Sequence, residues 1–191
     1  MINWLKENNA CQSGIDWCKE NCGTMQDVWD KLKRVDWLVW VATREGVLTD
    51  KELRLFACFC ARQNWHLLTD ERSRNAIEVA ERFANGNATK GELKAAYAAA
   101  DAAFDAVAAA YAAYADAAYA YDAAYAYDAA RAADAAYAAD AAAAAAYPAH
   151  AAAADAARVA RAASASAAYD ASKEQMEWLR ANTTPNFGGT K

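Results

Sequence analysis

The sequence contains few residues that break helices, because only 2 of its 191 residues are proline and 7 are glycine. The low glycine content excludes a collagen-like chain, in which every third residue is glycine. Cysteine is also scarce, and its odd number of 5 favours reduced thiols over a disulfide framework. No uncharged run reaches the about 18 strongly apolar residues that a membrane-spanning helix needs. We therefore expect neither a disulfide scaffold nor a membrane protein.

Positive charge is nearly missing from the second half of the chain. Residues 1–94 carry 14 Lys+Arg and 14 Asp+Glu, whereas residues 95–191 carry 6 and 11, so the second half accounts for the whole net charge of −5. Between Asp101 and Asp155, eight aspartates accompany the single Arg131. Proteins that bind nucleic acids cluster Lys and Arg on one face. We therefore expect no direct binding of DNA or RNA by this half.

The N-terminus shows no sign of a secretion signal, since it has neither a long apolar core nor a small-residue cleavage site. This predicts a cytoplasmic protein. The sequence also contains no glycine-rich loop of the kind that cradles phosphates. We expect no cofactor.

Alanine is present in large excess, and it occupies 48 of the 78 positions from Ala95 to Ser172. All ten tyrosines fall in this stretch, while six of the seven tryptophans lie at or before Trp65. Alanine has the highest helix propensity, so disorder is not expected there. The change in composition along the chain predicts three regions. These are a Trp-rich helical head over 1–92, an Ala/Tyr/Asp-rich region of long helices over 93–181 with a break near Pro148, and a flexible tail over 182–191.

Helix starts in the head are marked by capping-box patterns, in which Ser or Thr is followed three residues later by Asp or Glu. Four such patterns begin at Ser13, Thr24, Thr49 and Thr89, and Thr69 followed by two acids marks a fifth start. These side chains bind free backbone N–H groups, and the acid favours the positive end of the helix dipole. Each pattern therefore predicts the first turn of a helix.

Helix ends are marked by Gly23, Gly46 and Gly86, at positions where a left-handed residue commonly stops a helix. Together with the starts, they predict helices over 13–22, 24–33, 35–45, 49–68 and 69–85. The last two carry apolar residues at the i, i+3, i+4 spacing of a buried helix face. The segment 35–45 is apolar on nearly all sides, which predicts a central helix. No segment alternates at period two, so the sequence predicts an all-α fold.

The alanine region contains no Pro or Gly from Leu93 to Tyr147. One helix of that length would span about 80 Å, longer than a compact domain, so it either projects or folds back. Alanine lets helices approach closely, and tyrosine rings fill the gaps between them. We expect long helices in an antiparallel hairpin or bundle, docked on the head or on a second copy. The aromatic pattern fails near residues 119–128, where a bend is one explanation.

A row of aromatic residues is the first candidate binding site. Helical spacing places on nearly one face Tyr97, Phe104, Tyr111, Tyr114, Tyr121 and Tyr125. Asp101 and Asp105 lie roughly opposite on the helical wheel. Tyrosine is enriched at recognition surfaces, so the row predicts a surface for a protein partner, either a host protein or a second copy in a homo-oligomer.

An arginine cluster is the second candidate, and it consists of Arg62, Arg72, Arg74 and Arg82. Guanidinium groups bind phosphates and carboxylates in two-point contacts, so the cluster could hold an anion or an acidic partner. The alternative, which we favour, is a set of ion pairs on helix surfaces with Glu71, Glu78 and Glu81.

No catalytic or metal-binding pattern stands out in the sequence. Cys18 and Cys22 are one helical turn apart and could share a face with Cys11, but neither Cys-x-x-Cys nor His-x-x-x-His accompanies them. They are interpreted as small packing residues and not as zinc ligands. His66 has no Ser or Cys partner at a catalytic spacing. We predict no catalytic residue, no metal ligand and no enzymatic activity.

The segment of about 35–95 resembles a known group of proteins. The residues that carry the resemblance are Asp36-Trp-Leu-Val-Trp, Ala57-Cys-Phe-Cys-Ala-Arg62, Asp70-x-Arg72-x-Arg74-x-Ala-Ile-Glu78 and Phe83-Ala-x-Gly86-x-Ala-Thr-x-x-Glu92-Leu. They are similar to uncharacterised alanine-rich helical proteins of phages and gut bacteria, related versions of which are labelled immunity proteins of toxin systems. Members of this group also continue into Ala/Tyr/Asp-rich helices. The resemblance implies no activity and no site residue.

Together these observations favour a non-enzymatic, cytoplasmic, phage-type interaction protein that binds and blocks a host protein, either a defence component or a toxin. One alternative is a structural role, in which the alanine helices mediate oligomerisation in a virion or an assembly. Another is capture of a small nucleotide signal by the arginine cluster.

Overall fold

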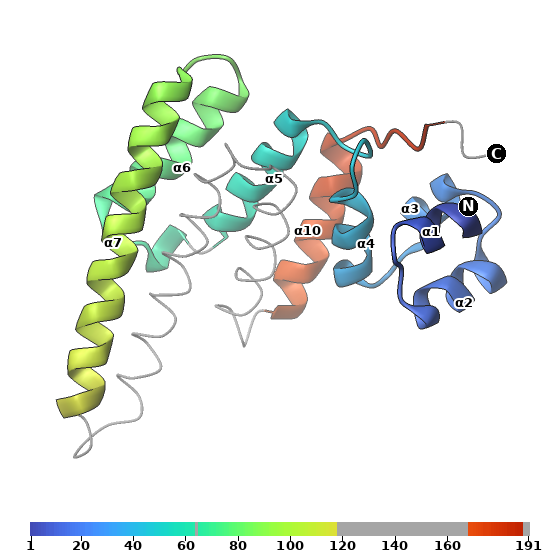
Figure 1. The fold of residues 1–191 in the computed structure, drawn as a ribbon, viewed down its shortest axis with the longest axis horizontal. Coiled ribbons are helices and arrows are strands. Elements are labelled where there is room, and N and C mark those ends of the chain that lie inside the picture. The colour runs from blue at the N-terminus through green and yellow to red at the C-terminus, as the bar shows by residue number, and fades with distance from the viewer. Residues whose placement is uncertain (64, 118–167, 189–191) are drawn as a thin grey trace.

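The computed structural model describes residues 1–63, 65–117 and 168–188 (Figure 1). The helices are α1 (Ile2–Glu7), α2 (Gln12–Asn21), α3 (Met25–Lys31), α4 (Val35–Ala42), α5 (Asp50–Arg62), α6 (Glu71–Ala84), α7 (Lys90–Ala117) and α10 (Ala168–Asn182), with a 3₁₀ turn at Trp65–Leu67. Within these ranges there is no strand. The all-α prediction is confirmed.

Three of the predicted capping boxes form. The Thr24 hydroxyl accepts a hydrogen bond from the Asp27 backbone N–H at 3.0 Å, and the Asp27 carboxylate accepts one from the Thr24 N–H at 2.9 Å. Thr49 and Glu52 make the same exchange at the start of α5, as do Thr89 and Glu92 at the start of α7. Helices α3, α5 and α7 therefore begin directly after their predicted caps.

Two predicted starts are wrong by one or two residues. The N-cap of α2 is Cys11, so Ser13 lies inside the first turn, and the Asp16 carboxylate is bound by side chains of α2 itself. The N-cap of α6 is Asp70, whose carboxylate accepts a hydrogen bond from the Arg72 N–H at 2.8 Å. Asp is a stronger cap than Thr, which explains why Thr69 loses this role.

Of the three predicted glycines, only Gly86 directly follows a helix C-cap, which is Asn85. Gly46 lies three residues after Thr43, the C-cap of α4. Gly46 and Gly86 adopt left-handed conformations, with φ of 77° and 78°. Gly23 does not, because α2 already ends at the extended residue Cys22. The Gly23 N–H donates to the Asp27 carboxylate at 2.9 Å and so belongs to the start of α3. Four helices are also shorter than predicted: α3 ends at Lys31, α4 at Ala42, α5 at Arg62 and α6 at Ala84.

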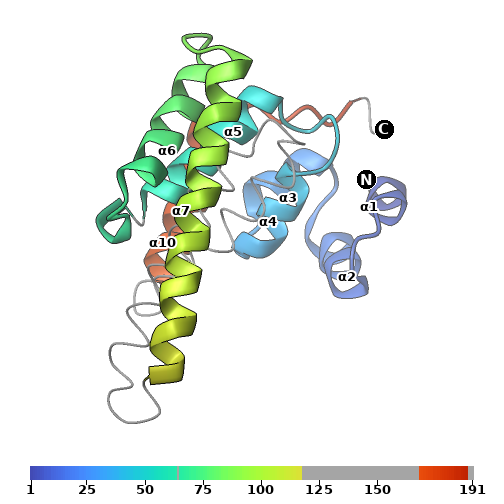
Figure 2. The same cartoon turned by 60° about the vertical axis from the view of Figure 1, so that its left-hand side comes forward.

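The helices lie side by side in an order that differs from their order in the chain. Helix α7 packs against α6, and α6 against α5. The C-terminal helix α10 then packs against both α5 and α4, and lies between them in Figure 1. Helices α1, α2 and α3 form the opposite end of the row from α7 in Figure 1, and Figure 2 shows α1 and α2 on the side away from α6.

One hydrophobic core crosses the boundary expected at residue 92. Its cluster includes Leu5 of α1, Phe56 of α5, Leu93 of α7 and Leu179 of α10. Among the side chains of α7 that the structure describes, the buried apolar ones are those of Leu93, Ala96, Ala100 and Ala103. The small alanine side chains among them permit close contact with α6.

Residues after α10, where a flexible tail was expected, contact the head at three points. The Thr184 N–H donates to the Glu52 carboxylate at 3.0 Å, and the Asn186 N–H donates to the Val47 carbonyl at 2.7 Å. The Phe187 ring packs edge-on against Trp29, with centroids 6.3 Å apart. This segment therefore follows the surface of the head as far as Phe187.

Several predictions for the alanine region fall outside the described residues, including the bend near 119–128, the break near Pro148 and the hairpin itself. Helix α7 is continuous from Lys90 to Ala117. Of the helices that the structure describes, none combines the length and apolar character that crossing a membrane requires.

Candidate functional site

The predicted tyrosine row lies largely beyond what the structure describes. Tyr97 is half-buried and packs against the core, so it does not stand freely in solvent. Phe104, Tyr111 and Tyr114 lie on α7, but their side chains are outside the described part of the chain. Tyr121 and Tyr125 lie beyond it altogether. That the tyrosine row forms a binding surface for a protein partner stays a prediction.

The four arginines of the predicted cluster each have a carboxylate partner. The shortest N–O distances are 2.5 Å for Arg62–Glu81, 2.7 Å for Arg72–Asp70, 3.3 Å for Arg74–Glu71 and 3.5 Å for Arg82–Glu92. Pairs with Glu71 and Glu81 agree with the favoured interpretation, whereas Asp70 and Glu92 replace the expected Glu78.

Arg62 and Arg74 also share an aromatic neighbour, because both guanidinium groups lie over the Trp65 ring, at 4.6 and 5.5 Å from its centroid. Such cation–π contacts hold the two groups in place. A phosphate at this cluster would have to compete with carboxylates already bound to the same nitrogens.

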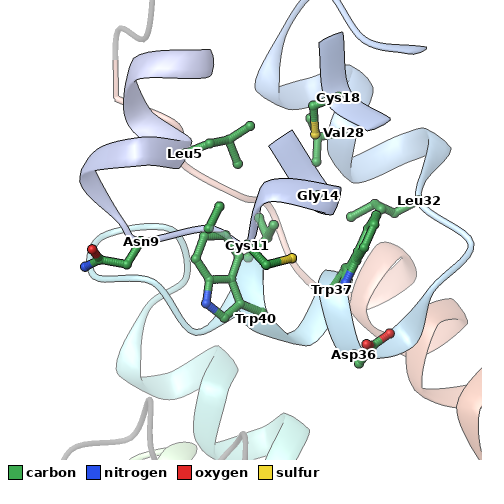
Figure 3. Close-up of a pocket in the computed structure, with 12 residues that line it drawn as sticks. Leu5, Asn9, Cys11, Gly14, Cys18, Val28, Leu32, Asp36, Trp37 and Trp40 are labelled. Carbon is green, nitrogen blue, oxygen red and sulfur yellow. The ribbon is translucent and has the colours of Figure 1, made fainter. Parts of the chain in front are cut away.

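A different site lies at the other end of the row of helices, where a pocket of about 290 Å³ opens between α1, α2, α3 and α4 (Figure 3). We call it the apolar pocket. Its lining comprises Leu5, Asn9, Ala10, Cys11, Gly14, Cys18, Val28, Leu32, Asp36, Trp37, Trp40 and Val41. Most of these side chains are apolar, and Asn9, Cys11 and Asp36 supply its polar groups.

Local sequence features build this pocket. Trp37 and Trp40 are three residues apart on α4 and therefore lie on one face of that helix. Asn9 has a φ of 60°, a left-handed conformation that Asn tolerates better than most residues, and it turns the chain from α1 towards α2. Cys11 follows as the N-cap of α2, and its thiol lies between the two tryptophans in Figure 3.

The two tryptophans that line the pocket, Trp37 and Trp40, each pack edge-to-face against a second tryptophan. Trp4 packs against Trp40 with centroids 6.2 Å apart, and Trp17 against Trp37 with centroids 6.3 Å apart. All four rings are half-buried and so remain partly exposed to solvent. We call Trp4, Trp17, Trp37 and Trp40 the tryptophan face.

Two arginines cover the edges of this face. The Arg34 guanidinium lies 4.2 Å from the centroid of Trp37, and that of Arg44 lies 4.9 Å from the centroid of Trp40. Arg34 is also paired with Asp36 through two hydrogen bonds, at 3.2 and 2.5 Å. These contacts orient the exposed rings.

A second cavity of about 430 Å³ adjoins the first, and we call it the basic pocket. Its lining comprises Trp17, Asn21, Lys31, Leu32, Lys33, Arg34 and Trp37. Leu32 and Trp37 therefore line both pockets. The three cations of the basic pocket are Lys31, the last residue of α3, and Lys33 and Arg34, which lie between α3 and α4.

The cysteines near the tryptophan face differ in their acidity. Hydrogen bonds with the Ser13 hydroxyl and the Gly14 backbone N–H lower the pKa of the exposed Cys11 thiol. Burial raises the pKa of Cys18 to about 11, and it also raises that of Cys22. In the described ranges no three His, Cys, Asp or Glu residues are grouped so that they could hold a metal ion.

We expect Cys11 to be the thiol that alkylating reagents modify first. A lower pKa gives more thiolate at neutral pH, and the thiolate is the nucleophile. Limited reaction with iodoacetamide, followed by peptide mass spectrometry, measures the rate at each cysteine. The alkylation rate at Cys11 should rise with pH. It should reach half its maximum at a pH below the pKa of an ordinary thiol, which is about 8.5.

Ser13→Ala is the matched control for this prediction, because it removes the hydroxyl that hydrogen-bonds the thiol at 3.4 Å. This variant should shift the midpoint of the pH profile upwards. Faster alkylation of Cys18 or Cys22 than of Cys11 would contradict the environment assigned to the Cys11 thiol. An unshifted pH profile in Ser13→Ala would contradict it as well.

The tryptophan face and its pockets were missed by sequence reasoning. The segment 35–45 was expected to be central because it is apolar on nearly all sides. In the structure, Leu38, Val39 and Val41 of α4 are buried, but Trp37 and Trp40 reach the surface. The concentration of tryptophan in the head was the available signal.

Comparisons of this chain with models of protein families, with curated proteins and with solved structures found no match.

Proposed function

We propose that this chain is a non-enzymatic, phage-type interaction protein that binds and blocks a host protein in the cytoplasm, and that it binds through the tryptophan face. The observation that carries the proposal is the set of four half-buried tryptophans in two edge-to-face pairs. Tryptophan and arginine are the residues most enriched at binding hot spots, and Arg34 and Arg44 flank these rings.

The arrangement also suits tight binding on entropic grounds. Rings that already pack on one another lose little freedom when a partner covers them, so more of the gain from burying their apolar surface remains as affinity. The phage-type and host-blocking parts of the proposal rest on the resemblance of residues 35–95. The cytoplasmic part rests on the N-terminal sequence.

Two observations bear on the alternative functions, nucleotide capture and oligomerisation. Each arginine of the cluster is already paired with a carboxylate, which disfavours capture of a nucleotide signal there. Oligomerisation remains compatible with an exposed apolar face, since a second copy could cover it. The experiment below separates a host partner from a second copy.

The proposal is tested by affinity capture from a bacterial lysate with quantitative mass spectrometry. We expect at least one host protein to be captured by the wild type, and its yield to fall about tenfold or more with the double variant Trp37→Ala/Trp40→Ala, as expected for hot-spot residues. Trp65→Ala is the control, because Trp65 is also half-buried but lies beside α6.

Circular dichroism of each variant checks that the helices form, and light scattering at tens of micromolar reports self-association. Equal capture by the wild type and both variants would overturn the role of the tryptophan face. A dimer that dissociates on Trp37→Ala/Trp40→Ala, with no host protein captured, would favour the oligomerisation alternative.

A further inference from the structure

Building on the proposed protein-binding function, we propose that the tryptophan face accepts a partner segment in which a bulky apolar side chain neighbours an acidic one. The apolar side chain enters the apolar pocket, and the carboxylate lies in the basic pocket.

The size of the apolar pocket favours a single side chain as its occupant. Its volume of about 290 Å³ lies at the lower limit of the roughly 300–1,000 Å³ typical for pockets that hold whole small molecules. Leu5, Val28 and Leu32 are almost fully buried around it. With the Trp37 and Trp40 rings (Figure 3), they form an apolar wall of the kind in which interface anchors sit.

The charges of the basic pocket favour one carboxylate beside that anchor. Lys31 is paired with Asp27 at 2.9 Å, and Arg34 with Asp36. Among the described residues, exposed Lys33 has no ion-pair partner. Lys33 is therefore the cation of the lining with which a single acidic side chain of the partner would pair.

The hydrogen bond with Asp27 and, more weakly, the charge of Asp30 raise the pKa of Lys31, so these acidic groups act on Lys31. Asp30, on the last turn of α3, accepts a hydrogen bond from Gln26 at 3.0 Å and is not part of the pocket lining. A basic partner segment would meet Lys33 as a like charge. A nucleic acid is also a poor occupant, since its affinity comes from many simultaneous cation–phosphate contacts.

The positions of the two pockets determine the spacing of the partner's residues. Leu32 and Trp37 line both cavities, so the two sites are separated by the width of these side chains. The apolar and acidic groups must therefore come from neighbouring positions of one segment, either consecutive in an extended chain or one turn apart on a helix.

The test is selection of a random-peptide library on the full-length protein. We expect peptides that combine Trp, Phe or Leu with a neighbouring Asp or Glu. Lys33→Glu should weaken a selected peptide about tenfold in fluorescence anisotropy, as loss of a complementary charge does. Lys94→Glu is the matched control, because Lys94 is an exposed lysine of α7 at the other end of the molecule.

A second measurement uses only the wild-type protein, so its result does not depend on whether a variant folds. Because Cys11 lines the apolar pocket, a bound peptide should slow its alkylation, and the same peptide with its apolar anchor changed to Ala should not. Selection of basic peptides, selection of none, equal binding by Lys33→Glu and Lys94→Glu, or unprotected Cys11 would each overturn the assignment.

The two proposals fail in different ways. If host-protein capture depends on Trp37 and Trp40 but the selected peptides lack acidic residues, the tryptophan face binds a protein and the assigned partner chemistry is wrong. If acidic peptides bind as expected but the variants capture the same host proteins as the wild type, the face has the assigned chemistry and the proposed function is wrong.

Discussion

Replacement of Leu179 by alanine should lower the free energy of unfolding by about 3 kcal/mol, within the about 2–5 kcal/mol typical for buried Leu→Ala substitutions. Leu179 has no exposed surface and belongs to the core that α10 shares with α4 and α5. The substitution removes buried methyl groups and leaves a cavity where three helices meet. Urea unfolding followed by tryptophan fluorescence measures the change.

Glu177→Ala is the matched control, because Glu177 lies on α10 but 64% of its side chain is exposed. Both variants gain the helix propensity of alanine, and Glu177→Ala loses only an exposed ion pair with Lys173 at 3.8 Å, so the difference between them reports mainly burial. We expect Glu177→Ala to change the free energy of unfolding by less than about 0.5 kcal/mol, as for ordinary surface sites. Similar values for the two variants would show that α10 is not part of the core.

Replacement of Arg180 by alanine should cost about 2 kcal/mol of unfolding free energy, the order expected for hydrogen bonds from a charged donor. The Arg180 guanidinium donates to the Trp29 carbonyl at 3.0 and 2.9 Å and also to the Leu32 carbonyl. These carbonyls belong to the last turn and C-cap of α3, where no further helical N–H is available to them. A positive charge there also favours the negative end of the helix dipole.

Two variants calibrate this prediction in the same urea experiment. Arg180→Lys keeps the charge but loses the fork that reaches two carbonyls, so its loss should be smaller. Arg72→Ala removes an exposed ion pair with Asp70 and should cost less than about 1 kcal/mol. A loss in Arg180→Ala no greater than that in Arg72→Ala would mean that the bond to α3 contributes little.

Arg180 also connects the core to the proposed binding surface. Leu32 lines both pockets, and the next two residues supply cations of the basic pocket. Loss of the Arg180 bonds should therefore weaken peptide binding as well as stability. Leu179→Ala, measured under conditions where it remains folded, should affect stability alone.

Local features were predictable where both interacting groups lie within one helical turn. The caps at Thr24, Thr49 and Thr89 formed as expected, because each requires two side chains three residues apart and nothing else. The predicted starts at Ser13 and Thr69 were wrong. The Asp70 carboxylate caps α6 in place of Thr69, whereas Cys11 precedes α2 without a side-chain cap hydrogen bond.

The candidate binding surface was not predictable in the same way. Hydrophobicity alone predicts burial of Trp37 and Trp40, yet α1 and α2 cover these rings only in part. The pockets take their linings from four helices and the connections between them, so their existence depends on how those helices pack. The arginine cluster was easier to interpret, because all four arginines pair with carboxylates that lie on α6, at its N-cap or at the start of α7.

By itself, the sequence determined the helical class, most helix starts in the head and the concentration of negative charge after residue 94, because these follow from composition and contacts a few residues apart. Only the tertiary structure decided that α10 lies between α4 and α5, and that Trp37 and Trp40 line a pocket. Arg180 and Trp29 are 151 residues apart in the chain, and Gln175 and Gln63 are 112 apart. Such contacts depend on the folding of the whole chain, and no local pattern of residues encodes them.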